Sequence, residues 1–170
     1  MLKIFVMAMF SLAIGILSYS FKLDISYTDY KDYCTILLAV SGMVFTIMGI
    51  WIAFVYPNAI KRLQDPDKIK IADFTKTLED TRRLESIVGS VLESATVATG
   101  ITLVFFAKLM ITGTTIYKGN LLIFESSGIA FIVFLTLVQS SAIFGVIWSN
   151  YLFIADLHSR RETQERHNDF

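Results

Sequence analysis

Residues 127–154 decide the fold class. They read SGIAFIVFLT LVQSSAIFGV IWSNYLFI and contain no charged side chain. A helix needs about 20 consecutive, mostly apolar residues to cross the hydrocarbon core of a bilayer. Within lipid every backbone amide must be satisfied internally, and a single unbroken segment can do this only as a helix. This stretch therefore predicts a transmembrane helix.

Three further stretches have the same character. They cover residues 4–21, 36–56 and 92–112, and the second stops at Pro57, which cannot continue a helix. Hydrophobic residues make up 54% of the 170-residue chain, above the roughly 45–50% of soluble domains. The sequence predicts an all-α, four-pass transmembrane helical bundle. A single membrane domain then covers residues 1–170, with a loop at 57–91 and a tail at 155–170.

The first stretch has a second interpretation. Lys3, the apolar run after it and the small residues Ser18 and Ser20 loosely fit a cleaved signal peptide. A retained helix gives an even number of crossings, which agrees with the charge distribution. We therefore expect the first stretch to stay as a span.

Basic residues predict the orientation. Eleven of the 15 Lys and Arg residues fall in the N-terminus, the 57–91 loop and the tail. The positive-inside rule places these segments, and so both termini, in the cytoplasm. Trp51, Tyr56, Trp148 and Tyr151 then fall at the cytoplasmic interface, a depth that amphipathic rings prefer.

The 57–91 loop carries a helical pattern. The run Asp65-Pro66-Asp67 is typical of a helix start, with an acidic N-cap before proline at the first helical position. Apolar residues then recur on one face. We expect one helix over residues 67–112, and a charged tail that extends the fourth helix. The third and fourth helices would thus both extend into the cytoplasm.

An apolar stripe on a cytoplasmic helix needs a covering surface. The tail, another subunit, a soluble partner or the membrane surface could each provide it. The predicted partner-binding residues are Ile71, Phe74, Leu78, Arg82, Arg83, Arg160 and Arg161.

Small residues recur along the spans at helical spacing. Such stripes let helix backbones approach closely in lipid. They could pack one bundle or join copies of the chain, and we favour a homo-oligomer because four stripes exceed the needs of one bundle. The predicted helix-packing residues are Ser11, Gly15, Gly49, Ser94, Ala98, Ser141 and Gly145.

Three polar residues lie within the spans, where ionisable groups are costly. Glu93 could be solvated, be paired with Arg82, Arg83 or another basic group, or belong to an ion pathway. Lys108 can extend its stem to the interface. Gln139 is the deepest; we expect a hydrogen bond to another helix or to its own copy, with a pore-lining role as the alternative.

The sequence offers no catalytic constellation. His158 and His167 lie in the charged tail without nearby cysteine, and Cys34 is the single cysteine. There is no HExxH, GxSxG, P-loop or GxGxxG motif. Equal numbers of basic and acidic residues, 15 each, give no sign of a nucleic-acid surface. We expect a non-enzyme without catalytic residues, metal or cofactor, whose surroundings are the lipid bilayer.

The layout resembles a known family. Size, four passes, inward termini and a helical cytoplasmic loop are similar to KwaA, the small membrane subunits of bacterial Kiwa antiphage systems. The most distinctive local string is GIWIAFVYPN at residues 49–58. The resemblance implies an oligomeric component of the bacterial inner membrane that senses envelope disturbance and holds a soluble DNA-binding partner.

Our first hypothesis is a membrane scaffold or sensor that recruits a cytoplasmic protein through the 58–91 helix and the tail. The alternatives are an oligomeric, holin-like pore and a bacteriocin-immunity membrane protein.

Overall fold

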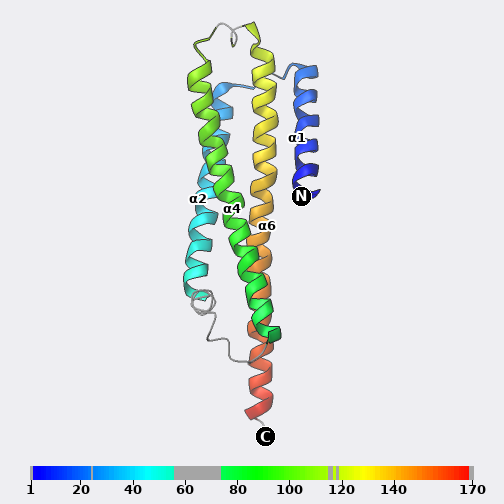
Figure 1. Cartoon of the computed structure of the whole chain (residues 1–170), viewed down its shortest axis with the longest axis vertical. Helices are drawn as coiled ribbons and strands as arrows, with labels where there is room; N and C mark the ends of the chain where they lie inside the picture. Colours follow the sequence, from blue (N-terminus) through cyan, green and yellow to red (C-terminus); the bar gives the residue numbers. More distant parts are fainter. Residues whose placement is uncertain (1, 24, 56–73, 115–116, 118, 169–170) are drawn as a thin grey trace.

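The chain is helical throughout the residues described. The structure is a computed structural model that describes residues 2–23, 25–55, 74–114, 117 and 119–168. Side chains at residues 53–55, 74–83, 156, 157 and 159–168 lie outside the description. Within these limits there is no strand, and there are four long helices (Figure 1): α1 (Leu2–Phe21), α2 (Tyr27–Val55), α4 (Phe74–Ile111) and α6 (Leu121–Asn168).

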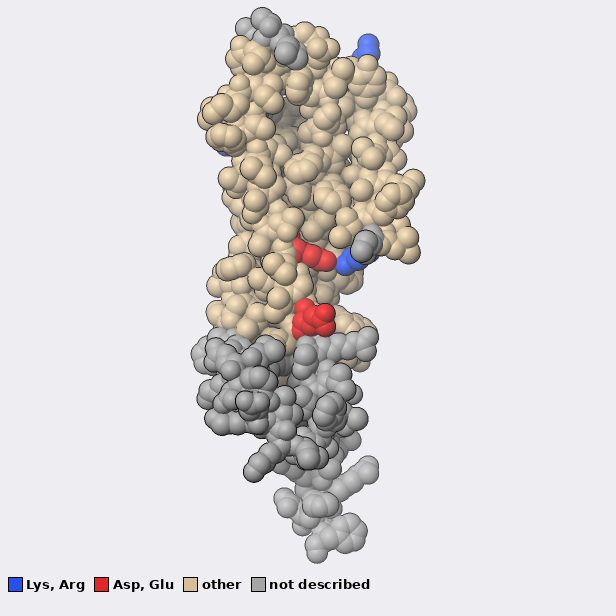
Figure 2. Space-filling view, viewed as in Figure 1, with Lys and Arg blue, Asp and Glu red and all other residues tan. Residues whose placement is uncertain are grey.

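All four helices are long and apolar enough to cross a membrane. Their apolar segments are Leu2–Phe21, Tyr27–Ile52, Leu84–Ile111 and Leu121–Ala155. Large apolar side chains point outward along them, such as Phe5 on α1 and Phe144 on α6, which are 62% and 73% exposed. Soluble monomers rarely expose contiguous apolar surface on this scale. On the face drawn in Figure 2, charged side chains are sparse over the described part. The all-helical fold is confirmed, together with four helices long and apolar enough to span a membrane, and the chain has the features of a multi-pass membrane protein.

Helix α6 is the centre of the bundle, since each of the other three helices packs against it. Helices α2, α4 and α6 form a three-helix core, and α1 lies along the outside of α6 (Figure 1). The core contains two apolar clusters. One is built from Cys34, Leu37, Val97, Ile101, Ile132 and Leu135. The other is built from Val44, Met48, Leu84 and Ile87, with Trp51 and Val146 packed against it.

The turn between α1 and α2 is fixed by local hydrogen bonds. The Leu23 amide donates to the Ser18 carbonyl (3.2 Å) and the Lys22 amide to the Tyr19 carbonyl (3.4 Å). Lys22 has a φ of 48°, so this helix end is a Schellman motif with lysine in the left-handed position that glycine usually takes. The motif satisfies two carbonyls at the end of α1.

Helix α2 begins earlier than its apolar stretch, at Tyr27 rather than near residue 36. The Ser26 hydroxyl accepts a hydrogen bond from the Thr28 amide (3.3 Å), and Asp29 lies in the first turn. A serine cap and an acidic first turn both stabilise a helix N-terminus. Capping therefore sets this boundary, nine residues before the apolar run begins.

Helices α4 and α6 continue past their apolar segments at the same end of the bundle (Figure 1). The predicted extension of the fourth helix into the tail is confirmed, because α6 reaches Asn168. Helix α4 is continuous over Phe74–Ile111, while the predicted start at residues 65–67 lies outside the described residues. We call residues 74–83 of α4 and 156–168 of α6 the stalk.

Candidate functional site

A layer of three polar side chains crosses the three-helix core. Gln139 of α6 is 2% exposed, and its Oε1 accepts a hydrogen bond from the Ser41 hydroxyl of α2 (2.9 Å). Its Nε2 donates to the Ser94 hydroxyl of α4 (3.4 Å). We call Ser41, Ser94 and Gln139 the polar layer. It joins all three core helices through one amide group.

The polar layer lies between the two apolar clusters. Along α2, Ser41 falls between Leu37 and Val44, each of which belongs to a different cluster. The Ser41 hydroxyl also lies 2.9 Å from the Leu37 carbonyl, so two acceptors share its one proton. The layer contains no group that titrates near neutral pH. It can fix the register of three helices, and it supplies no acid or base for catalysis.

A second polar cluster joins α1, α4 and α6. The Lys3 ammonium lies 3.6 Å from Glu93 Oε1, and the Ser141 hydroxyl donates to Glu93 Oε2 (2.9 Å). Lys3 also donates to the Ser141 hydroxyl. We call these three residues the ion-pair cluster. The side chains of Lys3 and Glu93 are 58% and 37% exposed, so the cluster lies at the edge of the bundle.

The ion-pair cluster marks where α1 starts to cover α6. Trp148 lies seven residues beyond Ser141, about 10 Å farther along α6 at 1.5 Å per residue. Phe144 and Trp148 are exposed there. Helix α1 begins partway along α6 (Figure 1). The first helix therefore covers only part of the apolar length of α6.

Lys108 lies far from both clusters. Its ammonium is 3.0 Å from the centre of the Tyr27 ring, a cation–π contact between the end of α4 and the start of α2. The sequence singled out Glu93, Lys108 and Gln139 together. The structure places Gln139 in the core and Glu93 at the edge of the bundle at nearly the same level, and Lys108 near the end opposite the stalk. They form no common site.

Small residues lie at the helix contacts. A Cβ at Gly15 would lie 2.7 Å from the Ala130 side chain, so α1 and α6 approach closely there. A Cβ at Gly145 would meet the Ser90 hydroxyl of α4. Ser11 is buried on α1, and Ala98 is half-buried on α4. By contrast, a Cβ at Gly49 would meet nothing within 4 Å, so Gly49 makes no close approach within one chain.

The predicted partner-binding side chains are not placed. Ile71 lies outside the described residues altogether. The others all lie on the stalk, and their side chains are outside the description: Phe74, Leu78, Arg82, Arg83, Arg160 and Arg161. Their role stays a prediction.

Sequence reasoning missed the partners of the intramembrane polar groups. Lys3 was considered only as a positive charge for orientation and as part of a signal-peptide interpretation, and Ser41 was not singled out. Ser41 carried a usable signal, a hydroxyl at mid-span in the same apolar setting as Gln139. A third interhelical contact, between the hydroxyls of Tyr33 and Thr136 (2.9 Å), also escaped notice.

No group of three or more His, Cys, Asp or Glu side chains among the described residues could hold a metal ion. Cys34 is a free, buried thiol within the core.

The chain matches no protein-family model, no curated protein and no solved structure.

Proposed function

We propose that this chain is a non-enzymatic scaffold of the bacterial inner membrane that recruits a soluble protein through a cytoplasmic stalk. The observation that supports this is the continuation of α4 and α6 beyond their apolar segments at one end of the bundle. From Leu84 back to Phe74 is about 15 Å of helix, and from Ala155 to Asn168 is about 20 Å. Two antiparallel extensions of this length offer a docking surface outside the lipid.

The orientation rests on charge. The stalk end of the chain holds most of the Lys and Arg residues, and both termini lie on this side in the proposal. Basic flanks stay in the cytoplasm because translocating them is unfavourable. The stalk would therefore meet cytoplasmic proteins.

The bundle would give the stalk a rigid base. Helix α6 runs without a break from the membrane into the stalk, and the polar layer ties it to α2 and α4. A change in how the helices pack within the membrane would move the stalk with them. This coupling, with the layout resemblance to Kiwa membrane subunits, supports a sensor in an antiphage defence complex. Homo-oligomerisation stays part of the proposal, through exposed small residues such as Gly49.

Co-purification from the native host tests the proposal. The F74D/L78D variant places two charges on the predicted apolar stripe of the stalk. Burying one large apolar side chain is worth about 1.5–3 kcal/mol, so loss of two should weaken recruitment more than about 100-fold. The K76D variant is the matched control, because it changes net charge by the same two units on the opposite face of the helix.

We expect a soluble partner in stoichiometric amount with the wild type and with K76D. It should be lost from F74D/L78D, while that variant still reaches the membrane at normal levels. Retention of the partner by F74D/L78D would contradict recruitment through this stripe. A wild-type complex that contains no other protein would contradict the scaffold function itself.

A further inference from the structure

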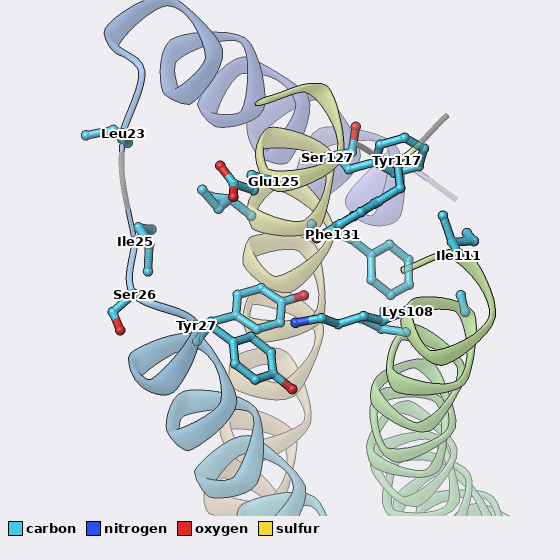
Figure 3. A pocket seen from close by; sticks show the side chains of 16 residues that line it. Leu23, Ile25, Ser26, Tyr27, Lys108, Ile111, Tyr117, Glu125, Ser127 and Phe131 are labelled. Atoms are coloured by element: carbon cyan, nitrogen blue, oxygen red, sulfur yellow. The ribbon is translucent and has the colours of Figure 1, made fainter. Parts of the chain in front are cut away.

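A cavity of about 470 Å³ opens at the end of the bundle opposite the stalk. It lies where α2 and α6 begin and α4 ends, and Figure 3 shows side chains from all three helices around it. Its volume is within the ~300–1,000 Å³ typical of ligand sites. Most of its lining is apolar, including Ile25, Val104 and Phe131.

Two opposite charges line this cavity without pairing. Lys108 reaches in from α4 toward Tyr27, and Glu125 lies on α6, nearer the end of the bundle at which that helix begins (Figure 3). Among the described residues, neither side chain forms an ion pair, although both line one cavity. A lysine in an apolar membrane site is costly without a counter-charge. A bound anionic group would supply one.

A third polar group lines the same space. Tyr30 of α2 is half-buried, and its hydroxyl lies against Gly128 of α6, 3.3 Å from where a Cβ would stand. No described residue forms a hydrogen bond with that hydroxyl. It is therefore free to donate to an anion held at Lys108. Tyr117 and Phe124 pack together at the cavity, with ring centroids 5.4 Å apart, and ring faces attract cations.

An apolar groove adjoins the cavity. It runs between α1 and α6, has a volume of about 590 Å³, and is lined by residues such as Leu12, Ile16 and Ala130. Ser127 and Phe131 line both the cavity and the groove. A cavity that holds two charged side chains, beside a groove lined by apolar residues, fits an amphiphile, with its headgroup in the cavity and an acyl chain in the groove.

We propose that this end of the bundle binds a zwitterionic phospholipid, with its phosphate at Lys108 and Tyr30 and its ammonium at Glu125. The order of charges supports this ligand, because Glu125 lies nearer the end of the bundle than Lys108 (Figure 3). In a lipid such as phosphatidylethanolamine the phosphate likewise lies deeper than the ammonium. An anionic lipid without an ammonium would leave Glu125 beside negative charge. This site is independent of the stalk.

Native mass spectrometry of the delipidated protein in detergent tests the site. The probes are dilauroyl phosphatidylethanolamine and dilauroyl phosphatidylglycerol, which share chains and phosphate and differ in the ammonium. We expect the wild type to bind the ethanolamine lipid more tightly. Charge-assisted hydrogen bonds are strong, so E125Q should weaken ethanolamine-lipid binding about tenfold and leave the glycerol lipid unaffected. K108Q should weaken both lipids.

Two kinds of control separate charge from folding. D32N and K31Q remove charges near the start of α2 that do not line the cavity, and both should bind like the wild type. A107F fills the cavity without changing charge and should weaken both lipids. Equal wild-type binding of the two lipids, or unchanged binding in E125Q or A107F, would overturn the proposal. Displacement of the lipid by phosphoethanolamine at equal concentration would assign the site to a free headgroup and also overturn it.

Discussion

The polar layer and the ion-pair cluster are anchored only two residues apart on α6, at Gln139 and Ser141, yet they differ in kind. Gln139 faces the core, where it is buried, neutral and hydrogen-bonded to two helices. Ser141 faces the edge, where it joins a Lys–Glu pair that is partly exposed. Helix α6 thus contributes a neutral amide inside the bundle and, at the edge, a hydroxyl that contacts charged residues of α1 and α4.

The difference follows from the cost of desolvation. A buried amide needs only hydrogen-bond partners, whereas a buried ion pair must also recover the large hydration energy of two charges. The Ser41 and Ser94 hydroxyls satisfy the buried amide of Gln139, and partial exposure reduces the desolvation cost of the ion pair. The contacts should therefore differ in strength, and separate variants can test each one.

The largest effect should come from detaching α1, which removes Lys3 from the ion-pair cluster and leaves the polar layer in place. Gly15→Leu puts a side chain where even a Cβ would lie 2.7 Å from Ala130. We expect a loss of about 2–3 kcal/mol in unfolding free energy, as for other overpacked sites. Unfolding in mixed detergent–SDS micelles measures it.

Gly42→Leu is the matched control, because nothing lies within 4 Å of a Cβ there. Its unfolding free energy should stay within about 0.5 kcal/mol of the wild type. Equal destabilisation by the two variants would mean that α1 does not pack on α6 through Gly15.

A smaller effect should follow from removing the amide of the polar layer. Gln139→Leu loses both interhelical bonds and leaves Ser41 and Ser94 to bond elsewhere. Interhelical hydrogen bonds in membranes average about 0.6 kcal/mol and reach about 1.7, so we expect a loss of about 1 kcal/mol. The same unfolding assay applies.

Ser140→Leu serves as the neighbouring control, since Ser140 is exposed and bonds only the Thr136 carbonyl of its own helix. It should be nearly neutral. A Gln139→Leu variant as stable as Ser140→Leu would show that the polar layer contributes nothing to stability.

The smallest effect should be the coupling within the ion-pair cluster. A double-mutant cycle with Lys3→Met and Glu93→Gln should give less than about 1 kcal/mol, because both side chains are substantially exposed. The coupling should fall further as salt is added. A salt-independent coupling above about 3 kcal/mol would indicate a pair shielded from water and contradict the expected solvation of Glu93.

The sequence predicted the fold where local chemistry alone decides it. Residues 127–154 have no charge and can only span as a helix, and the charged tail continued the same helix without a proline or glycine to stop it. The start of α2 was missed because apolar content was given more weight than the Ser26 cap.

The candidate sites were predicted only in part, because contacts between helices depend on their relative rotation and depth. Gln139 was expected to bond another helix, and it bonds two. The partner of Glu93 is Lys3, which lies 90 residues away in the sequence, so no local spacing could indicate the pair. The cavity at Lys108 is formed by the ends of three helices. No short sequence pattern predicts that such ends come together.

The central claim is that the stalk lies in the cytoplasm, and cysteine labelling of intact cells tests it most directly. Single cysteines at residues 78 and 160 of the stalk, and at residue 23 of the opposite end, would be made in a Cys34→Ser background. With a membrane-impermeant maleimide, we predict labelling at residue 23 in intact cells, and at residues 78 and 160 only after lysis. Labelling of either stalk position in intact cells would place the stalk outside and contradict the account.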